Sequence, residues 1–245
     1  MAGNYRKKKF DVDIVLVIDA TGSMWRCIQT VKENANRLYD DICTKMAADH
    51  REVNQMRIRV IAFRDYVAYL EDHETPMQVT PFFTMPEEED KFRAVVDSIQ
   101  AVGGGDDPED GLEALAFAIR SDWAKEKPGI DRRQIIVLWT DAATHELGYG
   151  KNVDLYPKSM AKDFSELTAW WGAAGGNNTG YMNYESKRLL LYAPNEERWT
   201  TITNGWDNVI HVATQANQFA DTLNELARSE EYSQIVQLLV KTIQQ

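Results

Sequence analysis

The stretch Asp19-Ala20-Thr21-Gly22-Ser23-Met24 directly follows an apolar, β-branched run at residues 12–18. Such a run is typical of a strand that is buried on both faces of a parallel sheet. The acidic and hydroxyl side chains therefore stand where a strand ends and a helix begins. The carboxyl ends of parallel strands meet at one edge of the sheet, which is where α/β proteins bind their ligands.

Two further segments bring oxygen atoms to similar positions. The loop Gly103-Gly104-Gly105-Asp106-Asp107-Pro108-Glu109-Asp110 precedes an apolar helix pattern, and Asp141 follows a second buried run at residues 134–140. Glycine adopts backbone conformations closed to other residues, so this loop can bring Asp106 close to the first segment. A Mg²⁺ or Mn²⁺ ion prefers about six oxygen ligands. The candidate ligands are Asp19, Thr21, Ser23, Asp106 and Asp141.

Strand and helix patterns alternate along the rest of the chain. Further strands are expected at residues 56–63, 66–70, 188–192 and 209–213, and helices at residues 23–48, from 86 onward, 108–123, 158–171 and 218–240. The run at 66–70 follows its predecessor so closely that the two can pair only antiparallel. The pattern predicts an α/β, Rossmann-like doubly wound sheet, mostly parallel and six-stranded, with one antiparallel strand and helices on both faces.

Composition limits the classes of protein that fit. The 245 residues, 44% of them hydrophobic, are enough for one large domain at residues 12–245 after a flexible basic N-terminus at 1–11. A net charge of −11 disfavours nucleic acid or an anionic membrane as a direct partner. No window of about 18 apolar residues predicts a membrane span. Cys27 and Cys43 fall on one expected helix, too far apart for a disulfide, which favours reduced thiols and a cytoplasmic location.

Each segment also has a simpler interpretation. Asp, Thr and Ser are preferred helix N-caps, so the first segment alone could be a cap, and Asp141 could likewise cap the segment after it. The glycines could form a flexible turn. Agreement among three segments at one edge favours the metal site. We expect residues beside it to form a partner-binding rim, with interface-prone aromatics among them. The rim candidates are Trp25, Asp107, His145 and Tyr149.

Together these residues resemble the metal-ion-dependent adhesion site of von Willebrand factor type A domains. In that family the first strand ends in Asp-X-Ser/Thr-X-Ser, a later loop supplies a Thr, and a further strand ends in Asp. Asp19, Thr21, Ser23 and Asp141 match by position, whereas Asp106 stands where the family has Thr. The segments Phe63-Arg64-Asp65-Tyr66 and Asp141-Ala142-Ala143-Thr144-His145, with the glycine-rich loop, look most like the branch found in atypical alpha-kinase and hemicentin-like proteins.

The resemblance implies a non-enzymatic module that docks a protein partner through its metal, inside a cytosolic multi-protein system with an ATPase, kinase or phosphatase. A third carboxylate, Asp106, is expected to hold the ion better and to weaken its attraction for an acidic partner residue. An alternative function is a Mg²⁺-dependent phosphohydrolase with Asp19 as nucleophile, although Thr21 stands where a second acid is needed. A third alternative is a metal that only tethers three loops.

Overall fold

The structure is a computed structural model that describes residues 7–68, 75–104, 108–172, 180–214 and 229–245, with side chains in the last range described from residue 232. The elements, in chain order, are β1 (Lys8–Asp19), the 3₁₀ helix η1 (Gly22–Met24), α1 (Trp25–Asn34), α2 (Leu38–Ala48), β2 (Arg51–Phe63), β3 (Met77–Val79), β4 (Phe83–Met85), α4 (Glu89–Ser98), α5 (Gly111–Ile119), β5 (Asp131–Trp139), α6 (Phe164–Trp171), β6 (Lys187–Pro194), α7 (Glu197–Gly205), β7 (Val209–Thr214) and α9 (Ser229–Gln244).

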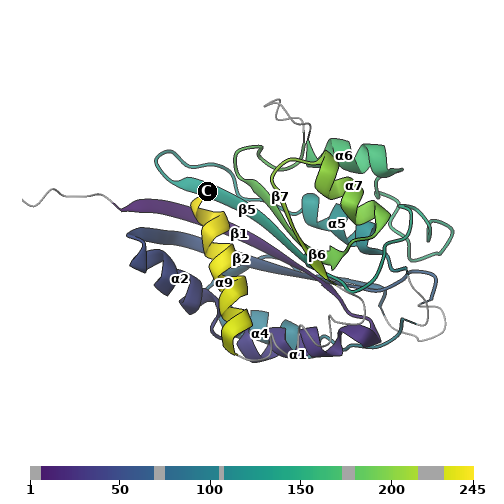
Figure 1. Cartoon of the computed structure of the whole chain (residues 1–245), viewed down its shortest axis with the longest axis horizontal. Coiled ribbons are helices and arrows are strands. Elements are labelled where there is room, and N and C mark those ends of the chain that lie inside the picture. Colours follow the sequence, from purple (N-terminus) through teal and green to yellow (C-terminus); the bar gives the residue numbers. More distant parts are fainter. Residues whose placement is uncertain (1–6, 69–74, 105–107, 173–179, 215–228) are drawn as a thin grey trace, which may run out of the picture.

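One sheet with the strand order β3-β2-β1-β5-β6-β7 runs through the centre of the molecule (Figure 1). The five long strands, β2, β1, β5, β6 and β7, pair in parallel. The short strands β3 and β4 both pair antiparallel with β2. The predicted fold class is therefore confirmed. Its antiparallel edge is divided between two segments of three residues each, so the described residues form seven strands where six were predicted.

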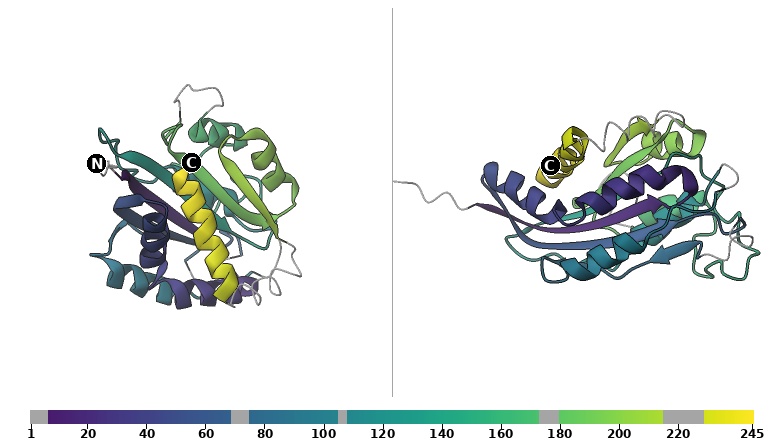
Figure 2. Two further views of the ribbon diagram at one scale, coloured as in Figure 1. Left: turned by 60° about the vertical axis from the view of Figure 1, so that its left-hand side comes forward. Right: turned by 90° about the horizontal axis from the view of Figure 1, so that it is seen from below.

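Helices cover both faces of this sheet because successive side chains of the central strand point to opposite sides. Ile14, Leu16 and Ile18 of β1 belong to a core formed with α1, α2, α4 and α9. Val15 and Val17 belong to a second core formed with α5, α6 and α7. Figures 1 and 2 show α9 lying across the same face as α2, and the two helices are in contact. Both faces of β1 are therefore buried, as its uninterrupted apolar run predicts.

Two expected elements differ from the structure. The strand predicted at 66–70 is wrong for residues 66–68, which form a turn, and residues 69 and 70 lie outside the described residues. The antiparallel edge comes from β3 and β4. The single helix expected at 23–48 is divided into η1, α1 and α2. The division falls at Asn34, whose side-chain amide donates a 2.8 Å hydrogen bond to the carbonyl of Thr30. Asparagine competes in this way with the helical backbone, so it favours helix ends.

Other boundaries move by a few residues. β1 begins at Lys8 rather than at residue 12, and Lys8 and Lys9 form ion pairs with Asp131 (2.6 Å) and Glu52 (3.0 Å). Residues 8–11, expected in a flexible N-terminus, are therefore part of the sheet. Helix α7 was not predicted at all, and α4, α5 and α6 begin three to six residues later than expected.

Cys27 and Cys43 lie on α1 and α2 and are both free thiols. Burial is the main cause that raises the pKa of each thiol above its ordinary value. Within the described ranges, no helix is both long and apolar enough to cross a membrane.

Candidate metal centre

The loop after β1 is held between two neighbouring segments by backbone hydrogen bonds. The N–H of Ala20 donates to the carbonyl of Phe63 at 2.8 Å, which continues the pairing with β2 beyond the end of β1. The N–H of Val102 donates to the carbonyl of Ala20 at 3.1 Å, and that of Gly22 donates to the carbonyl of Gly103 at 3.0 Å. The glycine-rich loop thus packs directly against the first predicted ligand segment.

Gly104 makes this close approach possible. Its φ is +80°, and a Cβ there would lie 2.8 Å from the Cβ of Thr21. Both the left-handed backbone and the missing side chain are therefore required, which only glycine supplies without strain. The position of the glycines in the sequence was the signal for this contact.

Asp19 is fully buried and its carboxylate is fixed by hydroxyl groups on two loops. Oδ1 accepts hydrogen bonds from the backbone N–H (3.0 Å) and the side-chain hydroxyl (2.7 Å) of Thr21. Oδ2 accepts a 2.7 Å hydrogen bond from Thr140, the residue just after β5. Thr140 was not predicted as part of the site. It joins the first and third segments by a direct contact.

Burial raises the pKa of Asp19 to about 6. The hydrogen bonds from Thr21 and Thr140 oppose this rise, and the nearby charge of Asp141 adds to it. A carboxylate in such surroundings is stabilised by any nearby cation, because the cation favours the ionised form. The electrostatics at the base of the site therefore suit a positive ion.

The outer part of the site combines Ser23 and Asp141, which are 118 residues apart in sequence. The hydroxyl of Ser23 donates to Oδ1 of Asp141 at 3.0 Å, and the hydroxyls of Thr21 and Ser23 lie 3.4 Å apart. Metal–oxygen bonds of 2.0–2.1 Å at right angles place neighbouring ligand oxygens about 3 Å apart. The observed spacing is compatible with octahedral ligands of one divalent ion. Because Ser23 is exposed and Asp19 is buried, such a site would open to solvent on the Ser23 side.

The structure thus brings together Asp19, Thr21, Ser23 and Asp141 of the predicted ligand set, and the role of each in metal binding stays a prediction. Asp106 and Asp107 lie outside the described residues. Trp25 and Tyr149 are exposed, at 52% and 51% of their surfaces. His145, the fourth rim candidate, is buried and so presents little surface to a partner.

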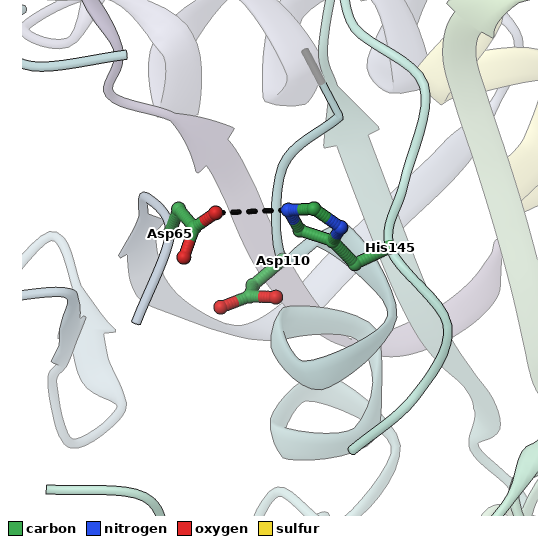
Figure 3. A group of neighbouring side chains, drawn as sticks. All are labelled: Asp65, Asp110 and His145. Carbon is green, nitrogen blue, oxygen red and sulfur yellow. Dashed lines mark hydrogen bonds and ion pairs between the residues drawn. The ribbon is translucent and has the colours of Figure 1, made fainter. Parts of the chain in front are cut away.

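His145 belongs to a second group of side chains, which we call the Asp–His cluster: Asp65, Asp110 and His145 (Figure 3). One potential ligand atom from each of the three residues lies within 4.8 Å of the other two. His145 Nε2 is 2.8 Å from Asp65 Oδ2, and the ring of Tyr149 stacks on the imidazole with centroids 3.8 Å apart. A cluster of this composition could hold a metal ion.

Backbone contacts explain how the Asp–His cluster forms. Asp65 follows β2, and Asp110 occupies the N-cap position of α5, where its side chain makes no capping hydrogen bond. The N–H of Glu109 donates to the carbonyl of Ala143 at 3.1 Å, and the N–H of His145 donates to the carbonyl of Glu109 at 2.9 Å. This short parallel bridge aligns the loop before α5 with the loop after β5, so Asp110 and His145 become neighbours.

The carboxyl groups of the cluster differ in their electrostatics. Although burial acts to raise it, hydrogen bonds from His145 and from the N–H groups of Val67 and Ala68 leave the pKa of Asp65 below its ordinary value. Burial, with the charge of Glu113 as the next cause, raises the pKa of Asp110 to about 8. Burial also raises the pKa of Glu113. All three cluster residues fall within motifs of the sequence, but no pattern there groups them, because their proximity depends on the bridge between distant loops.

With this geometry in place, the chain can be compared with known proteins. A family model for the von Willebrand factor A domain matches residues 13–154, more than half of the chain. The chain therefore belongs to the von Willebrand factor A domain family. No curated protein matches it.

Solved structures of low identity resemble it. The open conformation of the pilus adhesin SpaC from Lactobacillus rhamnosus GG is 15% identical, with a TM-score of 0.47, and the match covers 91% of this chain and 30% of SpaC. The vWF domain of the type V pili tip protein Mfa5 from Porphyromonas gingivalis is 17% identical (TM-score 0.35; 56% and 39% covered). Proximal thread matrix protein 1 from the mussel byssus, with a zinc-occupied MIDAS motif, is 11% identical (TM-score 0.38; 90% and 48% covered). The chain spans less than half the length of each.

Proposed function

We propose that this chain is a non-enzymatic interaction module that binds Mg²⁺ (or Mn²⁺) through Asp19, Thr21, Ser23 and Asp141 and docks a protein partner at that ion. The observation that carries the proposal is the 3.0 Å contact between Ser23 and Asp141, beside a buried Asp19. It places oxygen atoms from two distant loops at the spacing of octahedral ligands. Asp106 is proposed as a further ligand on the strength of its place in the sequence.

The shape of the site favours docking. Asp19 is buried at its base, whereas Ser23 is exposed at its outer side. An ion held there could take one more oxygen ligand from outside. Trp25 and Tyr149 are exposed aromatic side chains, a type that is enriched in interfaces. We propose both as contacts for the partner, together with Asp107.

A phosphohydrolase reaction suits this arrangement less well. A nucleophilic Asp19 would have to approach a phosphorus atom, yet the side chain is fully buried and both of its oxygens already accept hydrogen bonds. The residue two positions on is Thr21, and a hydroxyl is a poor general acid. The binding function therefore remains our preference over catalysis.

The setting of the module is proposed from the sequence motifs and from the two cysteines. The sequence motifs place the chain nearest to the alpha-kinase and hemicentin-like branch, and by analogy with that resemblance we propose a partner from a multi-protein system with an ATPase, kinase or phosphatase. Two free cysteines favour the cytoplasm, where thiols stay reduced.

Calorimetric titration of the full chain with MgCl₂ tests the proposed ion site. Ser23→Ala is expected to lower Mg²⁺ affinity by about tenfold or more, because it removes a ligand oxygen. Ser98→Ala is the matched control, since Ser98 is an exposed serine whose hydroxyl bonds only to the carbonyl of Val95. Equal affinity in the wild type and Ser23→Ala would contradict the assignment.

Capture of proteins from an extract of the native cells tests the docking function. Proteins that depend on the site should be retained by the wild type and Ser98→Ala in Mg²⁺, and lost with EDTA or with Ser23→Ala. Retention that EDTA leaves unchanged, together with a lower melting temperature in EDTA, would indicate a metal that only tethers loops. Mg²⁺-dependent turnover of a phosphate ester that Asp19→Asn abolishes would instead establish the hydrolase.

A further inference from the structure

The Asp–His cluster lies apart from the oxygen-only site and differs from it in chemistry. Its three residues come from the end of β2, the N-cap of α5 and the loop after β5, and all three are buried. Figure 3 shows the carboxylate of Asp110 beside the hydrogen-bonded pair of Asp65 and His145. An imidazole nitrogen and two carboxylates form a mixed donor set, whereas the first site offers only oxygens.

Asp110 is the most informative member of the cluster. Its Oδ2 accepts a 2.6 Å hydrogen bond from the backbone N–H of Tyr66. Its Oδ1 is buried and has no hydrogen-bond partner among the described residues. An unsatisfied buried carboxylate oxygen costs free energy unless a proton or a cation compensates it. Native proteins rarely keep such an atom without a reason.

The buried carboxyl groups around Asp110 also favour a bound cation. The carboxyl groups of Asp65, Asp110 and Glu113 are all buried in this region. In the part of the chain that the structure describes, no lysine or arginine forms an ion pair with any of them. Glu113 Oε1 accepts hydrogen bonds from the N–H of Gly148 (2.8 Å) and the hydroxyl of Tyr156 (3.0 Å), while its Oε2 has no described partner. Among the ion pairs of the described residues, only His145 is paired with one of these carboxyl groups, and an imidazole is charged only when it is protonated.

We propose that Asp65, Asp110 and His145 bind a second divalent ion of the borderline transition-metal class, of which Zn²⁺ is the probe, independently of the Mg²⁺ site. Imidazole suits Zn²⁺ and similar ions better than Mg²⁺, which prefers oxygen alone. Three protein ligands is also the number that Zn²⁺ has at sites that keep a fourth position for water.

The distances are compatible with such an ion. Zinc bonds of about 2.0–2.2 Å hold two ligand atoms between about 3 and 4 Å apart. The three candidate atoms lie within 4.8 Å of one another, so shifts of less than about 1 Å bring them to bonding positions. The stacked ring of Tyr149 holds the imidazole plane, with 7° between the two rings. Orientation of a histidine ligand by neighbouring groups is a regular feature of metal sites.

The competing explanation is a metal-free polar cluster, in which Asp110 carries a proton and the His145–Asp65 hydrogen bond ties the loops together. Both explanations predict that the cluster matters for folding. They differ in whether the wild-type chain takes up an ion at His145.

Zinc titration of the full chain in millimolar MgCl₂ tests the proposal, because excess Mg²⁺ competes at the oxygen-only site. We expect one equivalent of Zn²⁺ to bind the wild type, and His145→Gln and Asp65→Asn to weaken that binding by at least about tenfold. Ser23→Ala, which lacks a ligand oxygen of the first site, should bind Zn²⁺ as the wild type does. His211→Gln is the matched histidine control, since His211 on β7 bonds the carbonyl of Ala193 away from the cluster.

Two outcomes overturn the proposal: Zn²⁺ affinity that His145→Gln leaves unchanged, or Zn²⁺ binding that only Ser23→Ala abolishes, which would place zinc in the first site. Circular dichroism checks that each variant folds. X-ray absorption at the zinc edge of the loaded wild type keeps the proposal testable if the variants do not fold. A shell with one imidazole nitrogen supports it, and an oxygen-only shell refutes it.

Discussion

Replacing Asp110 by asparagine is expected to remove a pH dependence of stability from the metal-free protein. Burial raises the pKa of Asp110 from 3.8 to about 8, so between these values the folded state holds a proton that the unfolded state releases. The stability of the wild type should therefore fall as the pH rises from about 4 to about 8, and this contribution should be level below and above that window. Asparagine resembles the protonated carboxyl in shape and carries no charge at any of these pH values.

The structure sets the size of the effect. A difference of about four pKa units corresponds to an upper limit of about 5 kcal/mol, at ~1.36 kcal/mol per unit. Two effects reduce that limit: neighbouring dipoles relax around the ionised group, and the carboxyl group of Glu113, whose pKa is also raised, shares the titration. We therefore expect about 2–3 kcal/mol between pH 5 and pH 8.5. For a chain of this size, 1 kcal/mol shifts the melting temperature by about 2–4 °C. The melting temperature of Asp110→Asn minus that of the wild type should thus be about 4–12 °C larger at pH 8.5 than at pH 5.

Urea unfolding followed by tryptophan fluorescence, in EDTA at several pH values between 5 and 8.5, measures this difference. Asp97→Asn is the control, because Asp97 is an exposed aspartate on α4 and its replacement should leave the pH dependence of the wild type unchanged. If wild type and Asp110→Asn give parallel stability curves across this range, Asp110 is not the buried proton carrier and the reasoning fails.

The remaining predictions concern single contacts. Gly104→Ala should lower Mg²⁺ affinity about tenfold, because the new Cβ would push Thr21 away. Gly129 has a similar φ of +76° but open space around it, so Gly129→Ala should lower the stability of the chain and leave its Mg²⁺ affinity unchanged. Equal Mg²⁺ affinities for the two variants in calorimetry would contradict this. Gly111→Ala should lower the free energy of unfolding by about 1–3 kcal/mol, because the new Cβ would lie 2.7 Å from the ring of Trp199. Urea unfolding measures this loss, and Gly205→Ala should not show it, because the space around Gly205 is open. Arg57→Met should cost about 1.5–3 kcal/mol, because it removes the two hydrogen bonds of 2.8 and 2.7 Å that Arg57 donates to buried Asp13. Asp13 keeps a 2.9 Å hydrogen bond from the N–H of Ala124 and the guanidinium of Arg132 at 3.8 Å. The double variant with Asp13→Asn should recover most of that loss, and a double variant no more stable than Arg57→Met would show that the charge is not the cause.

Much of the fold could be predicted because it depends on local patterns. The apolar runs before Asp19 and Asp141 have the length of strands and lack polar alternation, which is typical of strands with helices on both faces. In the structure, the corresponding strands β1 and β5 pair side by side at the centre of the sheet. The edge of the sheet was harder to predict. β3 and β4 have three residues each, too few for alternation to appear in the sequence, so the turn at residues 66–68 was mistaken for a strand.

The first site was predictable for a related reason. Hydroxyl and acidic residues at the ends of buried strands must meet at one edge of a parallel sheet, and glycines show where a loop comes close. Sequence alone therefore determined that Asp19, Thr21, Ser23 and Asp141 would be neighbours. The hydrogen bond from Thr140 to Asp19 was not predicted, because the direction in which the Thr140 hydroxyl points depends on side-chain packing.

The Asp–His cluster was decided by tertiary structure. His145 lies four residues beyond a predicted ligand, and on that basis alone it was expected at the rim of the first site. The backbone bridge between Glu109 and Thr144 instead turns the loop inward and buries the imidazole against Asp65. A side chain's burial depends on which distant loop covers it, and periodicity along one chain segment carries no information about that partner. The sequence thus determined the sheet and the oxygen ligands at its edge, and only the packing of loops 80 residues apart brought a histidine and two carboxylates together.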